Sequence, residues 1–165
     1  MDINSLVSSL GLKGTLGSDV VFLILFLLLS FVLSVGLGRQ KILVAMLGVY
    51  ASYVAVSFIP KNFVSEQNTR ILIFVALVVA FIIFFGRIIR ASLSGSGAHY
   101  LIKSIIGSAI IIGLVLVIIF SWMGTKVLAS FVTPATKKYF TEDLYKFLWA
   151  IAPLVYLAVV RKKID

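Results

Sequence analysis

Long apolar runs separated by short polar segments dominate the pattern of the chain. Val20–Leu37 carries no charge after Asp19, and Ile42–Ile59 carries none before Pro60. The residues between these two runs are Gly38, Arg39, Gln40 and Lys41. An apolar run of about 20 residues can cross the ~30 Å hydrocarbon core of a bilayer as a helix. The pattern therefore predicts a hairpin of two transmembrane helices joined by a basic four-residue turn.

Two further apolar runs predict a second hairpin. Ile71–Phe85 reaches the length of a span if its helix continues past Arg87, whose long side chain can extend to the headgroups. The Ser- and Gly-rich stretch Ala91–Ala98 then interrupts the helix. The next run is Leu101–Met123, with Trp122 at the interface, where aromatic side chains gather. We expect a four-helix transmembrane core over 19–123, with spans at about 19–38, 42–60, 70–89 and 101–123.

The two ends of the chain are more polar. Residues 1–18 predict a tail or an interfacial helix, and Ser18 and Asp19 stand where the N-cap of the first span is expected. A carboxylate in a membrane span can also be a proton or ion site, but the position of Asp19 at the end of the span favours the N-cap. Residues 124–143 form a polar connection that closes on Thr141-Glu142-Asp143, a typical helix start.

The last segment, 144–165, leaves two readings open. Leu144–Val160 is apolar except for Lys146 and contains Pro153, which membrane helices tolerate. It predicts a fifth span followed by a basic tail, or an interfacial or re-entrant segment. The predicted fold class is all-α: a polytopic transmembrane helix bundle of four to five spans built from two helical hairpins.

Composition supports this class. Of the 165 residues, 61% are hydrophobic, and the mean hydropathy is +1.16. A soluble domain of ~150 residues buries only about 70% of the surface that its unfolded chain exposes. Lipid is therefore the expected solvent for most of the chain. The absence of cysteine from the sequence excludes disulfides and thiolate metal sites.

The net charge of +9 reflects 15 Lys and Arg against 6 Asp and Glu. Such a charge in a soluble protein suggests nucleic acid as a partner. Here the basic residues lie at helix ends and in short loops, so we expect membrane lipids and no nucleic acid. The expected headgroup and topology anchors on one side are Arg39, Lys41, Arg87, Arg90, Lys103, Arg161, Lys162 and Lys163. Under the positive-inside rule they predict an external N-terminus and a cytoplasmic C-terminus.

Small residues recur at helical spacing within the spans. They are Ser30, Ser34, Ala45, Gly48, Ser52, Ala76, Ala80 and Gly107. Small side chains let helix backbones approach closely in a membrane. We expect the first two spans to pack on each other through Ser30 and Ser34 on one side and Ala45, Gly48 and Ser52 on the other. We also expect the protein to form a homo-oligomer or to bind other membrane subunits.

Polar side chains inside the spans offer little chemistry. Tyr50, Tyr53 and Ser57 lie on one helix face and either hydrogen-bond between helices or border a water-filled path. The single His99 has no neighbouring ligand type and is expected to lie at the interface. Intramembrane catalysis needs convergent Ser and His, paired Asp or metal ligands, and no apolar span contains such a set. We therefore predict no enzyme activity and neither a cofactor nor a metal site.

Gly and Arg at the helix ends, with Gly within the helices, give the chain a recognisable layout over Asp19–Met123. The residues concerned are Gly36, Gly38, Arg39, Gly48, Pro60, Gly86, Arg87, Gly95, Gly97, Gly107 and Gly113. This layout resembles the colicin V production protein family of bacterial inner-membrane proteins. Members often carry an acidic-basic pair in the third connection, where this chain has His99-Tyr100. The resemblance implies the bacterial cytoplasmic membrane and a link to peptide-toxin export and envelope maintenance.

Three functions fit these features. The first is a non-enzymatic membrane protein that supports envelope transport, secretion or assembly as an oligomer or complex subunit. The second is a small pore or carrier whose path is lined by Tyr50, Tyr53 and Ser57. The third is a phage-type holin, which the small size, several spans and basic tail suggest.

Overall fold

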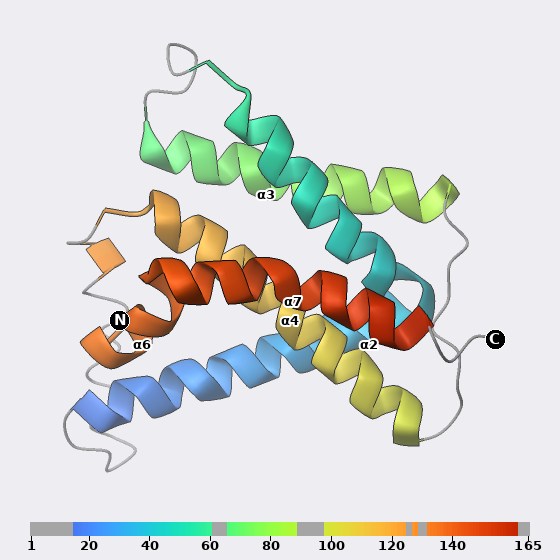
Figure 1. Cartoon of the computed structure of the whole chain (residues 1–165), viewed down its shortest axis with the longest axis horizontal. Coiled ribbons are helices and arrows are strands. Elements are labelled where there is room, and N and C mark those ends of the chain that lie inside the picture. Colours follow the sequence, from blue (N-terminus) through green and yellow to red (C-terminus); the bar gives the residue numbers. More distant parts are fainter. Residues whose placement is uncertain (1–14, 61–65, 89–97, 125–126, 129–131, 162–165) are drawn as a thin grey trace.

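The computed structural model describes residues 15–60, 66–88, 98–124, 127–128 and 132–161 (Figure 1). The named helices are α2 (Thr15–Ser57), α3 (Gln67–Ile88), α4 (Ala98–Trp122), α6 (Pro134–Thr141) and α7 (Asp143–Arg161). The described residues contain no strand, so the predicted all-α class is confirmed for this part of the chain. Of the expected tail, residues 1–18, the first 14 residues lie outside the described part of the chain. Residues 15–18 belong to the first turn of α2.

Three segments are long and apolar enough to cross a membrane. They are Asp19–Leu37, Gln67–Ile88 and Leu101–Trp122. Lys41–Ser57 is a shorter apolar helix. The fifth predicted span, 144–160, is helical as part of α7, but it is not one of the three segments.

The largest departure from the prediction lies at residues 38–41. The backbone stays helical through these positions, so the expected turn is part of α2. Nothing there excludes a helix, since proline is absent and Arg, Gln and Lys are good helix formers. A straight helix of these 43 residues would be about 65 Å long, roughly twice the hydrocarbon thickness. Figure 1 shows instead that the ribbon of α2 changes direction between its blue first half and its teal second half.

Helix α4 packs against both halves of α2. Near its start, the hydroxyl of Ser104 lies 2.6 Å from that of Ser34 in the first half of α2. Near its end, Trp122 stacks on Tyr53 in the second half, with 6.1 Å between the ring centroids. Phe22, close to the beginning of α2, packs on a core cluster that includes residues near the end of α4. Both halves of α2 therefore follow α4 toward the same end of the molecule.

Burial identifies α4 as the central helix. Of the apolar window in Leu101–Trp122, 56% is buried, against 11% for Asp19–Leu37 and 6% for Gln67–Ile88. The main core joins the second half of α2, α3 and α4 around the fully buried Ile42, Met46 and Phe74. The first half of α2 and the face of α3 away from this core thus lie at the periphery, where many of their apolar side chains are exposed.

Two glycines of α4 admit aromatic rings of α7. A Cβ at Gly107 would lie 3.0 Å from the Tyr156 hydroxyl oxygen and 2.9 Å from Cγ2 of Ile42. A Cβ at Gly113 would overlap the ring of Trp149. The Tyr156 hydroxyl also donates a hydrogen bond of 2.7 Å to the Lys103 carbonyl oxygen. Helix α7 is therefore held along α4 by close packing and by a hydrogen bond to its backbone.

Helix α3 packs on the second half of α2. A Cβ at Gly48 would lie 3.5 Å from the Phe81 Cβ and from the Ile82 Cγ1, both on α3. The sequence predicted that Gly48 faces the first half of α2, so this contact differs from the expectation. The sequence identified the small residues of α2, but which helix packs against them depends on the tertiary arrangement.

We expect Gly113→Ala to destabilise the protein by about 1–3 kcal/mol, because the added methyl group displaces the Trp149 ring from a packed site. Thermal unfolding of the purified protein in detergent, followed by tryptophan fluorescence, measures the effect. The matched control is Gly36→Ala, since a Cβ at Gly36 has open space around it. Equal melting temperatures for Gly113→Ala and the wild type would contradict the packing described here.

Candidate functional site

The best-defined site lies where the first half of α2 meets α6 and α7. A pocket of about 350 Å³ opens between these three helices. Its lining residues are Asp19, Phe22, Leu23, Phe26, Thr136, Tyr139, Phe140 and Trp149. The pocket therefore combines one carboxylate with five aromatic rings.

Asp19 connects α2 to the start of α6. Its Oδ1 accepts hydrogen bonds from the hydroxyls of Thr133 and Thr136. Thr133 is the N-cap of α6, and its Oγ1 accepts the backbone N–H of Thr136 at 3.3 Å. A negative charge beside a helix N-terminus is stabilised by the exposed amides and the helix dipole. Asp19 thus supports the start of a helix more than 100 residues away in the sequence.

The predicted N-cap role of Asp19 for its own helix is wrong. Helix α2 begins at Thr15, so Asp19 lies inside it. The sequence pattern placed the start of the helix at the start of the apolar run, whereas the helical backbone extends one turn further into the polar segment. Its carboxylate is therefore available to another helix.

Aromatic contacts hold the wall of the pocket. The Phe140 ring lies between Phe22 at 5.7 Å, edge to face, and Trp149 at 5.7 Å, stacked. The indole N–H of Trp149 donates to the Tyr139 carbonyl oxygen at 3.2 Å. Since Trp149 also fills the space at Gly113, the position of the wall depends on the contact between α4 and α7.

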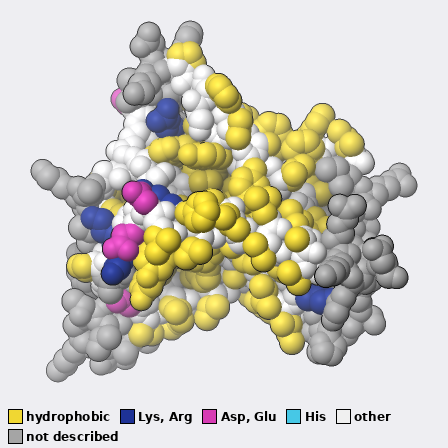
Figure 2. All heavy atoms as spheres, in the orientation of Figure 1, with side chains coloured by type: hydrophobic (Ala, Val, Ile, Leu, Met, Phe, Trp, Pro, Cys, Tyr) yellow, Lys and Arg dark blue, Asp and Glu magenta, His cyan; other side chains and the backbone are white. Residues whose placement is uncertain are grey.

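The charged side chains divide between the two ends of the bundle. Lys41, Arg87 and Lys103 lie at the end where α2 bends, and no acidic side chain of the described residues joins them. The opposite end carries the acidic residues Asp19, Glu66, Glu142 and Asp143, together with Arg70, Lys137, Lys138 and Lys146. Figure 2 shows charged side chains toward the two ends of the long axis and apolar side chains across the middle.

The predicted topology anchors fall partly within the described region. Lys41 and Arg87 are exposed, and Lys103 is half-buried. The backbone is helical at Arg39 and Arg161, although their side chains are outside the described part. The remaining anchors, Arg90, Lys162 and Lys163, lie outside the described residues. The side chain of His99 is likewise not described.

The predicted packing residues divide by helix. Those on α2 and α4 are buried: Ser30, Ser34, Ala45, Gly48, Ser52 and Gly107. Ala76 and Ala80 on α3 are exposed. The buried serines bond within their helices or across them, as in the Ser34–Ser104 pair. The small face of α3 thus meets no described helix of this chain.

The candidate polar path does not converge on one channel. The Tyr50 hydroxyl donates to the Ala150 carbonyl oxygen of α7. Tyr53 stacks on Trp122 of α4, and the Ser57 hydroxyl donates to the Tyr53 carbonyl oxygen at 2.7 Å. These groups therefore take part in packing and hydrogen bonding between and within helices.

Thr133 and Thr136, whose hydroxyls bond to Asp19, were not identified from the sequence. Thr133-Pro134 is a typical N-cap followed by proline in the first helical turn, and it could have located α6. No local pattern could have paired this helix with Asp19. Among the described residues, no group of three or more His, Cys, Asp and Glu side chains is placed to hold a metal ion.

No protein-family model matches this chain, and no curated protein or solved structure shows significant similarity to it.

We expect Thr136→Val to lower the free energy of unfolding by about 1.5–3 kcal/mol, the usual contribution of a hydrogen bond to a charged group. The matched control is Thr141→Val, because within the described part of the chain the Thr141 hydroxyl bonds only inside α6, to the Lys137 carbonyl oxygen. Denaturant unfolding in mixed micelles measures both variants. In the Asp19→Ala background, Thr136→Val should lower the free energy of unfolding only slightly further. If the losses of the two single variants add fully in the double variant, the hydrogen bond between Asp19 and Thr136 is refuted.

Proposed function

We propose that the protein is a non-enzymatic subunit of a bacterial cytoplasmic-membrane complex that supports envelope transport, secretion or assembly. The single observation that carries this proposal is the unpartnered apolar face of α3. A bundle that functioned alone would need only lipid around it. A face that also carries small residues suits the close approach of another helix.

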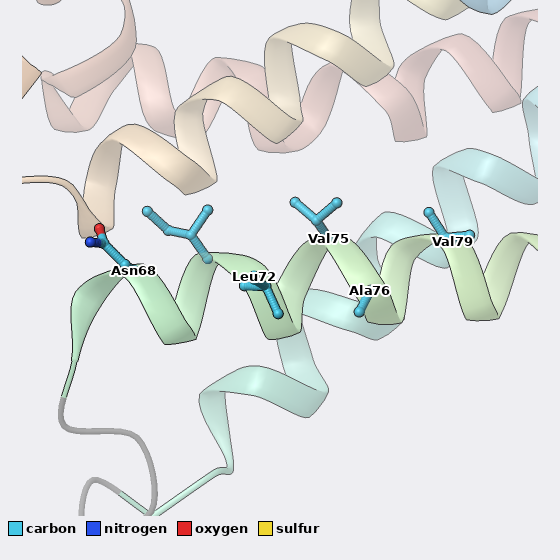
Figure 3. A pocket seen from close by; sticks show the side chains of 6 residues that line it. Asn68, Leu72, Val75, Ala76 and Val79 are labelled. Atoms are coloured by element: carbon cyan, nitrogen blue, oxygen red, sulfur yellow. The ribbon is translucent and has the colours of Figure 1, made fainter.

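The face of α3 is broad and continuous. A shallow depression of about 760 Å³ lies along it, lined by Asn68, Ile71, Leu72, Val75, Ala76 and Val79. Figure 3 shows that the labelled side chains all come from α3. Ala76 and Ala80 are four residues apart and both exposed, so they lie on one side of the helix. This arrangement supports α3 as the contact helix for a partner in the membrane.

Five crossings account best for the packing of the bundle. The two halves of α2 both follow α4 from the bend to the same end, as antiparallel spans of a hairpin would. Helix α7 has 19 residues, about 28 Å, and Tyr156 pairs with the start of α4 while Trp149 faces Gly113 further along. Its outward side chains, among them Phe147 and Val159, are apolar and exposed. We therefore include α7 as the fifth span.

Charge supports the proposed orientation. The end at the bend carries Lys41, Arg87 and Lys103, and the proposed topology assigns five further basic residues of the sequence to the same side: Arg39, Arg90, Arg161, Lys162 and Lys163. Positive charge close to helix ends is retained on the cytoplasmic side. We propose that the bend and the C-terminus face the cytoplasm and that the N-terminus is external. The resemblance to the colicin V production family suggests the process that such a subunit would serve.

The orientation can be tested on the natural background, because the chain contains no cysteine. We expect a membrane-impermeant maleimide to label Lys41→Cys in inverted vesicles and Glu142→Cys in spheroplasts, since both positions are exposed and lie at opposite ends. The cysteine-free wild type is the control. Labelling of both positions from one side would overturn the bent arrangement of α2, and exchange of the two patterns would reverse the orientation.

The subunit role is tested with a photo-reactive amino acid at Ala76, on the open face of α3. We expect a discrete adduct with a second copy of the chain or another membrane subunit, identified by mass spectrometry. Leu29, equally apolar in surroundings and 51% exposed on α2, is the matched control position. If Ala76 and Leu29 both yield only lipid adducts, α3 is not a contact helix and the proposal fails.

A further inference from the structure

We infer that the pocket between α2, α6 and α7 binds an organic ammonium ion that carries an apolar chain. Five aromatic rings line this pocket, from Phe22, Phe26, Tyr139, Phe140 and Trp149, and one carboxylate, from Asp19. The faces of aromatic rings attract cations, and quaternary ammonium groups in particular are held by aromatic cages. The Asp19 carboxylate lines the same pocket as these rings and adds a full negative charge opposite the cation.

No basic side chain of the described residues forms an ion pair with Asp19. The ion pairs at this end join Lys138 to Glu142 at 3.7 Å and Lys146 to Asp143 at 3.1 Å, and neither involves Asp19. Both threonine hydroxyls bond to Oδ1, and Oδ2 has no hydrogen-bond partner in the described part of the chain. The carboxylate therefore keeps one oxygen for a cation in the pocket.

The position of the pocket along the apolar segment and its volume indicate an apolar chain on the ligand. Asp19 is the first residue of the apolar segment Asp19–Leu37, so the pocket begins where the span begins. Leu23 and Phe26 continue the lining one and two turns further into the span. The volume of about 350 Å³ falls in the range of small-molecule sites. An ammonium head at Asp19 with an alkyl chain along Leu23 and Phe26 fits this lining.

The same chemistry has two sources, a lipid with an ammonium headgroup and a free amphiphilic amine. This site goes beyond the proposed complex subunit and does not rest on it. The pocket would bind its ligand in an isolated chain, and the α3 face would bind its partner with the pocket empty.

The test uses Trp149 as the reporter. The chain has two tryptophans, and Trp122 lies away from the pocket against Tyr53 and Phe74. In a Trp122→Phe background, the full-length protein in nanodiscs of phosphatidylglycerol is titrated with hexyltrimethylammonium. We expect a saturable change in Trp149 fluorescence. Hexanol and hexanoate, which share the chain but not the positive charge, should produce no saturable change at the same concentrations.

Asp19→Asn is the decisive variant, because the amide oxygen can still accept the threonine hydrogen bonds while the charge is lost. We expect its affinity for hexyltrimethylammonium to fall by about tenfold or more. Glu142→Gln removes a carboxylate at the same end but outside the pocket lining, and should bind as the parent does. Circular dichroism verifies the fold. Phe26→Leu, which keeps the polar contacts, should weaken binding severalfold and provides a second measurement if Asp19→Asn unfolds.

Three results would overturn the inference: no saturable change with the ammonium probe, equal binding of hexanol, or equal affinities for Asp19→Asn and the parent. Replacing part of the phosphatidylglycerol with phosphatidylethanolamine separates the two sources. If the natural ligand is a lipid headgroup, this lipid should compete and raise the apparent Kd of the probe. An unchanged Kd would assign the pocket to a free amphiphilic amine.

Discussion

The close approach of α4 to its neighbours at Gly107 and Gly113 is the constraint on which the structure depends. Lipid tails are as apolar as the side chains, so helices in a membrane gain little from burying apolar surface and associate through shape and hydrogen bonds. At Gly107 there is room for Ile42 of α2 and Tyr156 of α7 only because α4 has no side chain there. At Gly113 the same holds for Trp149. A larger residue at Gly107 would push α4 away from both α2 and α7, and a larger residue at Gly113 would push α4 away from α7.

This central position of α4 determines which surfaces remain free. Because α4 takes contacts from both halves of α2 and from α7, α3 packs on one side only, and its opposite face meets no described helix. The pocket depends on the same packing, since Trp149 reaches both Gly113 and the pocket wall. The interface proposed on α3 and the site at Asp19 thus have a common origin but use different helices, and neither needs the other to be occupied.

Hydropathy alone predicted the helical class and the positions of the long apolar segments, because lipid requires that every backbone polar group be bonded within its own helix. The helix start at Thr141-Glu142-Asp143 also has a local cause, and α7 begins at Asp143. The bend of α2 was predicted as a turn, because basic residues interrupt the apolar run without interrupting the helix. The partners of Gly48 and Asp19 could not be predicted. Each contact joins segments that lie far apart in the sequence, so no local spacing records it.

The polar groups of the bundle show why Asp19 stands apart chemically. Most serines of the apolar segments are bonded internally: Ser30, Ser52 and Ser57 to their own helices, and Ser34 to Ser104. The buried Ser108 hydroxyl has no partner among the described residues, which costs about 1–3 kcal/mol for a neutral group. A carboxylate that lacks a partner costs more free energy than a hydroxyl that lacks one, because a charge interacts more strongly with its surroundings than a dipole does. The hydroxyls of Thr133 and Thr136 both bond to Oδ1 of Asp19, and neither bonds to Oδ2. The second oxygen therefore keeps its capacity to interact with a cation, in a pocket lined by aromatic rings whose faces attract cations.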